Sequence, residues 1–112
     1  MRSIFTIIVL LAITTLASAQ VPVITSFSPE RADTGATVTI YGSNFVPDTA
    51  LNIVYFGGLR GRLLTADTDS IQVKVPVGAP YNFLSVTCNN LTAYSSKKFV
   101  PVFEGARNVS EQ

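Results

Sequence analysis

Histidine is absent from the 112 residues of this chain, and cysteine occurs only once, as Cys88. Without histidine the chain cannot build a Ser-His-Asp or Cys-His nucleophile, and it lacks the commonest protein ligand of zinc. With one cysteine it cannot form an intramolecular disulfide, so a hydrophobic core must stabilise the fold. These absences exclude several large classes of hydrolase and zinc enzyme.

Charged residues are few, at 13% of the chain, and the two signs almost balance. The chain has 8 basic and 7 acidic residues, and Arg2 is the only charged residue before Gln20, so the formal net charge of residues 20–112 is zero. Nucleic acids and anionic lipid surfaces are bound through clustered Lys and Arg. We therefore expect no nucleic-acid partner.

The first nineteen residues have the three-part layout of a secretory signal peptide. A short basic start at Met1-Arg2 precedes an apolar stretch from Ile4 to Ile13, and the small-residue site Ala17-Ser18-Ala19 follows. We predict a signal peptide at residues 1–19 and a protein that is secreted or lies at the cell surface. An uncleaved membrane anchor is the alternative, but the apolar stretch is shorter than the ~20 residues of a comfortable helical span. After cleavage we expect no stable membrane span.

After Gln20, short apolar runs alternate with Gly, Pro, Asn and Asp, and no stretch has a sustained helical period. The clearest strand is 71–75, in which every second residue is apolar. Frequent turn signals between such runs indicate an all-β, antiparallel β-sandwich. The predicted strands are 23–28, 37–41, 52–56, 61–65, 71–75, 83–88 and 91–94, with a last extended piece at 98–103.

Two turns are predicted from residue type. Residues 32–35 contain Asp33 and Gly35 and are expected to form a turn instead of a strand. Asn89-Asn90 separates two alternating runs, and Asn tolerates the positive φ that tight hairpin turns require. We therefore predict a β-hairpin at this pair.

Several short motifs follow one another in a distinctive order between Pro22 and Phe103. They are Phe27-Ser28-Pro29, Gly35, the run Val38 to Phe45, Val54 to Gly58, Ile71 to Pro76, Leu84 to Thr87 before Asn89-Asn90, and Phe99. Together they resemble IPT/TIG domains, an "early set" group of immunoglobulin-like modules. The resemblance implies an immunoglobulin-like β-sandwich of about seven antiparallel strands at residues 20–103, followed by a polar tail at 104–112. The chain departs from the family at Pro80-Tyr81-Asn82, where many relatives have a glycine-containing turn.

Seven residues of these motifs are expected to have structural roles. Gly42 is expected to adopt a backbone conformation closed to residues with a Cβ, which lets Phe45 fold back and plug one end of the sandwich. Proline cannot continue a strand ladder, so two prolines are expected to end strands. The full set is Pro29, Gly35, Gly42, Phe45, Gly57, Gly58 and Pro76.

The resemblance also implies an accessory or interaction module and not an enzyme. We predict no catalytic residues, metal or cofactor, and a role as a spacer or as a protein- or glycan-binding domain of a secreted or cell-surface protein. We expect the host to be bacterial and the chain to be either a small secreted binder or the N-terminal part of a larger surface protein. The alternative is an accessory carbohydrate-binding module of an extracellular polysaccharide-acting enzyme.

Tyr41, Tyr55 and Tyr81 form the candidate binding surface. Tyr41 and Tyr55 lie opposite the apolar residues of their strands, and Tyr81 lies in the atypical loop. Exposed tyrosines can stack on a sugar ring or anchor a protein contact. Cross-strand aromatic packing on a half-exposed sheet is the alternative.

Three further motifs have both a structural and a functional interpretation. Asp67 and Asp69 are expected to form a turn, with part of a calcium site or a glycosidase carboxylate pair as alternatives. Cys88 shares a face with Leu84 and Val86, so we expect a buried thiol, with an intermolecular disulfide as the alternative. Asn90-Leu91-Thr92 and Asn108-Val109-Ser110 match the N-glycosylation pattern, which matters only in a eukaryotic host.

Overall fold

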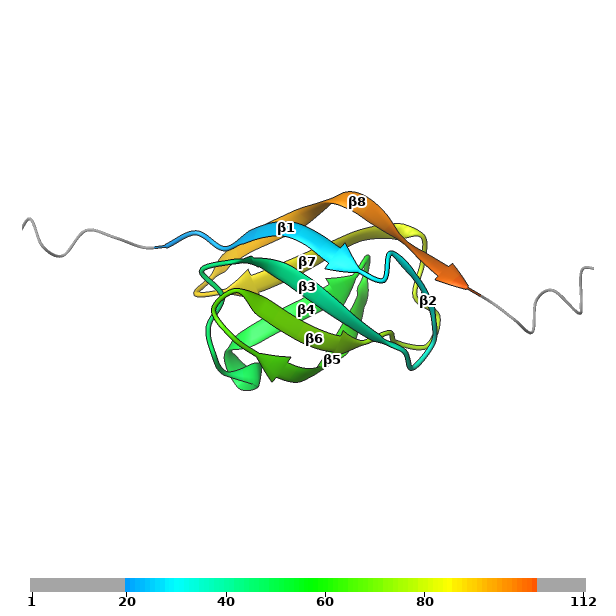
Figure 1. Cartoon of the computed structure of the whole chain (residues 1–112), viewed down its shortest axis with the longest axis horizontal. Helices are drawn as coiled ribbons and strands as arrows, with labels where there is room; N and C mark the ends of the chain where they lie inside the picture. The colour runs from blue at the N-terminus through cyan, green and yellow to red at the C-terminus, as the bar shows by residue number, and fades with distance from the viewer. Residues whose placement is uncertain (1–19, 103–112) are drawn as a thin grey trace, which may run out of the picture.

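Eight strands and one 3₁₀ turn account for most of residues 20–102, the part of the chain that the computed structural model describes (Figure 1). The predicted signal peptide at 1–19, the polar tail at 104–112 and the sequon at Asn108 lie outside the described residues. The elements are β1 (Val23–Ser28), β2 (Arg31–Asp33), β3 (Thr37–Ser43), η1 (Thr49–Leu51), β4 (Asn52–Phe56), β5 (Leu59–Ala66), β6 (Ser70–Lys74), β7 (Asn82–Cys88) and β8 (Leu91–Val102).

The strands form two layers that are joined along one side. Their hydrogen-bonded order is β1-β3-β6-β5-β4-β7-β8-β2. In Figure 1, β1, β3 and β6 lie in front, and β4 and β7 lie behind them. We call the first group, with the end of β5, the front layer, and β4, β7 and β8, with the start of β5, the back layer.

Strand β5 connects the layers because its two halves pair with different strands. Residues Leu59 to Gly61 pair with β4, and Arg62 onward pairs with β6. The chain crosses over the core at Gly61, which is buried. A Cβ at Gly61 would lie 2.6 Å from Cγ2 of Val73 and 2.9 Å from a ring carbon of Phe56. Only glycine fits at this crossing.

The core lies between the layers and consists of the inward residues of each alternating strand. Phe56 and Phe99 pack edge to face at its centre, with ring centroids 5.1 Å apart and planes at 87°. Phe45 is buried at one end of the core, as the sequence predicts. Other fully buried residues are Val38, Ile40, Val54, Ile71, Val73, Leu84 and Val86.

The all-β prediction is confirmed, but the expected strand count and purely antiparallel pairing are wrong. Of the turn predicted at 32–35, Thr34 and Gly35 do form a turn, but Ala32 and Asp33 belong to β2, which pairs in parallel with the end of β8. The predicted separate pieces 91–94 and 98–103 are one strand, β8, which contains Pro101. This strand changes partners along its length, since its first part pairs with β7 and its last residues also pair with β2.

Glycine is needed at position 42, as predicted, but not for the predicted reason of an unusual backbone conformation. Its φ does not lie in the left-handed region; the residue that does is Asn44, with φ 65°. Glycine is required at 42 because a Cβ would lie 1.8 Å from the carbonyl oxygen of Val23 on β1. Gly35 and Gly57 do have positive φ, at 85° and 64°, whereas Gly58 faces open space.

Both prolines of the set stand next to strand ends. Pro29 follows β1 through a cis peptide bond from Ser28. Pro76 lies two residues after β6, and its carbonyl accepts a hydrogen bond from Ala79 in the next turn. Both therefore lie outside the ladders, as expected of a residue with no N–H to donate.

Candidate functional site

Aromatic side chains are concentrated on the outer surface of the back layer. Tyr94 on β8 is 69% exposed, Tyr81 in the loop before β7 is 62% exposed, and Phe83 on β7 is 39% exposed. Tyr55 on β4 is half-buried. Because four aromatic side chains gather on one surface, this surface is the candidate site.

The strand register places two of these tyrosines in one row. Tyr55 pairs with Ser85 on β7, and Ser85 pairs with Tyr94 on β8. Directly paired residues project from the same face of a sheet, so both rings stand on the outer face with the small Ser85 side chain between them. Since adjacent strands lie about 4.8 Å apart, the backbones of the two tyrosines are about 10 Å apart.

Lys98 contacts the other two aromatic side chains of this surface, Tyr81 and Phe83. It pairs with Phe83 across β7 and β8. Its ammonium lies 5.1 Å from the ring centroid of Tyr81 and 5.4 Å from that of Phe83. One cation thus contacts two aromatic faces, an arrangement worth about 0.5–1 kcal/mol per contact at an exposed site.

Arg60 extends the tyrosine row onto β5. It is exposed and pairs with Tyr55, so it projects from the same face. We define the aromatic face as Tyr55, Tyr81, Phe83 and Tyr94 together with Arg60 and Lys98.

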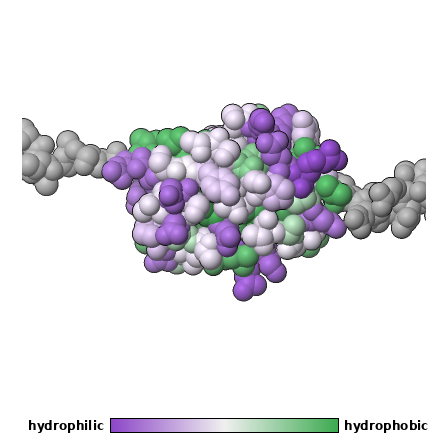
Figure 2. Space-filling view, in the orientation of Figure 1, coloured by the Kyte–Doolittle hydropathy of each residue, from purple (hydrophilic) through white to green (hydrophobic). Residues whose placement is uncertain are grey.

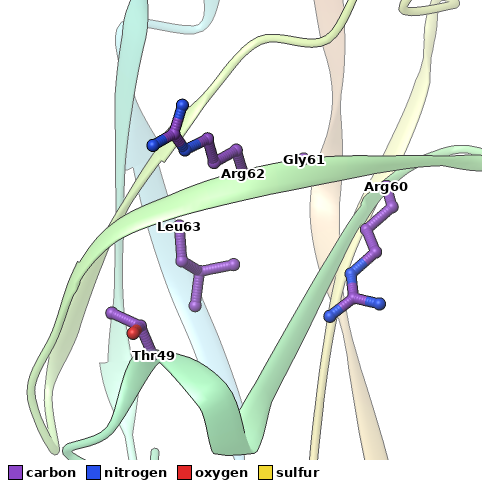
Figure 3. A pocket seen from close by; sticks show the side chains of 5 residues that line it. All are labelled: Thr49, Arg60, Gly61, Arg62 and Leu63. Atoms are coloured by element: carbon purple, nitrogen blue, oxygen red, sulfur yellow. The ribbon is translucent and has the colours of Figure 1, made fainter.

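A shallow cleft of about 380 Å³ lies beside Arg60. Its lining residues are Thr49, Arg60, Gly61, Arg62 and Leu63 (Figure 3). Arg60 projects from one side of β5 and Arg62 from the other (Figure 3). The register explains this difference, because Arg62 pairs with Lys74 of β6 and so belongs to the front layer. The cleft contains no carboxylate and no acid–base pair.

The three tyrosines predicted as a binding surface do not lie together. Tyr55 and Tyr81 belong to the back layer, but Tyr41 is on β3 and projects from the front layer. The visible face of the front layer is pale to hydrophilic, with only scattered hydrophobic side chains (Figure 2). Sequence reasoning missed Tyr94, Phe83, Lys98 and Arg60 as partners of Tyr55 and Tyr81.

Asp67 and Asp69 lie in the turn between β5 and β6, where their backbone groups are hydrogen-bonded. The N–H of Asp67 donates to the carbonyl of Ser70 at 2.8 Å, which closes the turn between β5 and β6. The carbonyl of Asp69 accepts from Gly42 at 3.0 Å. Within residues 20–102, no three side chains of His, Cys, Asp or Glu are grouped closely enough to hold a metal ion.

Cys88 is buried, as predicted, at the end of β7. Its Sγ lies 3.7 Å from the carbonyl oxygen of Asn44, which accepts a weak hydrogen bond. Burial raises the pKa of this thiol above its ordinary value of 9.0, and a backbone hydrogen bond at Val46 lowers it less. The thiol is therefore neutral near pH 7 and is not a reactive nucleophile.

No helix among residues 20–102 has the length and hydropathy needed to cross a bilayer. Sequon Asn90-Leu91-Thr92 lies at the hairpin between β7 and β8, where Asn89 and Asn90 are both exposed.

Comparison with known proteins relates nearly all of the described residues to one family. The sequence model of the IPT/TIG domain matches residues 22–100. No protein of curated function matches the chain in sequence.

Several solved structures contain a similar fold. An auxiliary nutrient binding protein from Bacteroides thetaiotaomicron is 25% identical over 74% of this chain and 21% of its own, with a TM-score of 0.71. A gamma-CGTase from alkalophilic Bacillus clarkii is 27% identical over 76% of this chain and 13% of its own, with a TM-score of 0.64. A surface glycan-binding protein from Prevotella bryantii shares the fold at 17% identity, over 74% of this chain and 21% of its own, with a TM-score of 0.64. The chain thus spans about a fifth of these proteins or less.

Proposed function

The chain belongs to the IPT/TIG family, and from that premise we propose that it is a non-enzymatic module of a secreted or cell-surface bacterial protein that binds a glycan on its aromatic face. The proposal rests mainly on one observation, the row in which Tyr55, Ser85 and Tyr94 lie side by side on three adjacent strands. Two proteins that contain this fold are described as a nutrient binding protein and a surface glycan-binding protein, which supports the same class of ligand.

The chemistry of the row suits a sugar better than a folded protein surface. A pyranose has an apolar face of C–H groups and hydroxyls around its edge. A tyrosine ring can stack on the C–H face while its hydroxyl exchanges hydrogen bonds with the sugar edge, and it loses little conformational entropy in doing so. Two tyrosines whose backbones lie about 10 Å apart on one face of a sheet can contact successive sugars of an extended chain.

Affinity electrophoresis tests this proposal. The full chain is run through gels that contain a panel of soluble neutral and acidic polysaccharides, and at least one of them should retard it. Tyr94→Ala should weaken the retardation about tenfold, because truncation of a central aromatic anchor typically costs more than 1 kcal/mol. Tyr41→Ala is the matched control, since Tyr41 is also exposed but projects from the front layer. Absence of retardation in every gel, or an equal loss in both variants, would contradict the proposal.

An accessory module of a polysaccharide-acting enzyme is the second candidate. It is favoured by the gamma-CGTase, in which a similar fold makes up 13% of the chain. In that case the aromatic face would have the same role, and the catalytic groups would belong to another domain.

A further inference from the structure

The strands of the back layer carry basic residues and no carboxylates. The outer face of the back layer carries Arg60 and Lys98 among its aromatic side chains. No carboxylate residue lies on β4, β5, β7 or β8. The described carboxylates are Glu30, Asp33, Asp48, Asp67 and Asp69, which lie in β2, in loops and in turns. The aromatic face is therefore locally basic although residues 20–112 carry no net charge.

Two of the described carboxylates accept hydrogen bonds from groups outside the aromatic face. Glu30 accepts from Lys97 at 3.3 Å, and Lys97 is not part of the aromatic face. Asp48 accepts from the N–H of Ala50 at the start of η1. Among residues 20–102, no salt bridge joins Arg60 or Lys98 to a carboxylate.

Arg60 and Lys98 occupy different parts of the aromatic face. Arg60 ends the row that runs through Tyr55 and Ser85 to Tyr94, a span of three strand spacings or about 14 Å. Lys98 lies beside this row, fixed over Tyr81 and Phe83. A ligand that stacks along the row therefore passes a guanidinium at one end and an ammonium beside it.

We propose that the glycan bound by the aromatic face is a polyuronate, a polysaccharide whose sugars carry carboxylates. This inference rests on the proposed function and names its ligand class. A neutral sugar laid on this face would cover two cations without pairing them, which costs desolvation energy. A uronate pairs them instead: its carboxylate fits the planar fork of Arg60, and a second one along the chain meets Lys98.

The test compares one polysaccharide in two charge states. Polygalacturonate and its fully methyl-esterified form have the same backbone, and only the first carries carboxylates. Calorimetric titration of the full chain should give at least tenfold tighter binding of polygalacturonate. The preference should shrink as NaCl is raised from 50 to 500 mM, because salt screens exposed charge pairs.

Arg60→Gln and Arg62→Gln form a matched pair of variants. Both residues are exposed and only two positions apart, but they project from opposite layers (Figure 3). Arg60→Gln should weaken polygalacturonate binding about tenfold and leave binding of the ester unchanged, whereas Arg62→Gln should change neither. Urea denaturation of each variant confirms that the fold is retained.

The outcomes separate this inference from the proposed function. Equal affinity for acid and ester, with loss of both in Tyr94→Ala, would overturn the polyuronate inference and retain glycan binding. Equal losses in the two arginine variants would also overturn it. Failure of every polysaccharide to bind would overturn both proposals.

Discussion

Asn52 and Val46 hold each other by two hydrogen bonds: the N–H of Val46 donates to Oδ1 of Asn52 at 3.2 Å, and Nδ2 of Asn52 donates back to the carbonyl of Val46 at 2.5 Å. The same Nδ2 donates to the carbonyl of Asp48 at 2.9 Å. Asn52 is fully buried, and its side chain adds to the backbone hydrogen bonds that the carbonyls of Val46 and Asp48 already accept in the segment that leads into η1.

Asn52→Ala should therefore lower the free energy of unfolding by about 1–3 kcal/mol, since it removes three hydrogen bonds of a buried side chain, among them the one that the N–H of Val46 donates. Urea denaturation measures the loss. Gln72→Ala is the control, because its hydrogen bond to Thr65 is exposed and its removal should change stability by less than about 0.5 kcal/mol. Equal effects of the two substitutions would show that the Asn52 bonds contribute little.

Gly61→Ala should destabilise the fold by about 1–3 kcal/mol, the usual cost of forcing an extra carbon into a packed core. The added Cβ would overlap Val73 and Phe56 where β5 crosses between layers. Gly58→Ala is a matched control three residues away, with no atom within 4 Å of its Cβ, and it should be neutral or slightly stabilising. Thermal unfolding of both variants checks this prediction; a normal Tm for Gly61→Ala would contradict it.

The hairpin at Asn89-Asn90 gives a third prediction. Both residues have positive φ, 53° and 63°, as the sequence analysis expected for a tight turn. Asn90→Ala should lower stability by about 1 kcal/mol, because alanine lacks the short polar side chain whose local hydrogen bonding lets asparagine adopt the left-handed region, and Asn90→Gly should not. If chemical denaturation finds both substitutions equally harmful, the side chain of Asn90 matters for another reason.

Cys88 should be inert to a thiol reagent in the native protein at pH 8 and react once urea unfolds it. Burial raises the pKa of its thiol above 9.0, so the folded state ionises at a higher pH than the unfolded chain. Stability from this difference is complete below pH 9.0 and is lost as the pH rises through the folded pKa. The free energy of unfolding should therefore fall more steeply above pH 9 in the native sequence than in Cys88→Ala. Parallel pH curves for the two proteins would contradict this.

Local pattern was enough to predict most strands and the buried positions of Phe45 and Cys88. It failed at β2, because Arg31-Ala32-Asp33 is short and polar and becomes a strand only by pairing with β8, far along the chain. The reason for glycine at position 42 was predicted wrongly, and the need for glycine at position 61 was not predicted at all. In both cases the atoms that exclude a side chain belong to another strand, β1 for Gly42 and β6 for Gly61. Spacing along one strand reveals which residues face out, but not which neighbours face out with them.

The candidate site also depends on strand pairing that the local sequence pattern does not reveal. Tyr55 and Tyr81 were identified from strand alternation and loop position, whereas Tyr94 and Arg60 join them only through the register of β5, β4, β7 and β8. Tyr41 was grouped with them because the sequence does not reveal which layer a strand enters.

The parallel pair of β2 and β8 has a mechanical consequence. In Figure 1 the start of the described chain (blue) and the end of β8 (orange) lie at opposite sides of the domain, and β2 pairs with the last residues of β8 through Arg31–Val100, Ala32–Pro101 and Asp33–Val102. Tension between the two ends would load the β1–β3 pair first and then the parallel β2–β8 pair, where it would act along the strands, so that the three β2–β8 pairs would share the load. The N–H of Val100 also donates to the carbonyl of Glu30 at 2.9 Å, and this hydrogen bond strengthens the contact between β2 and β8. In a module under drag from a bound polymer, this short parallel pair would thus hold the last residues of β8, the strand that carries Tyr94 and Lys98, against the rest of the domain.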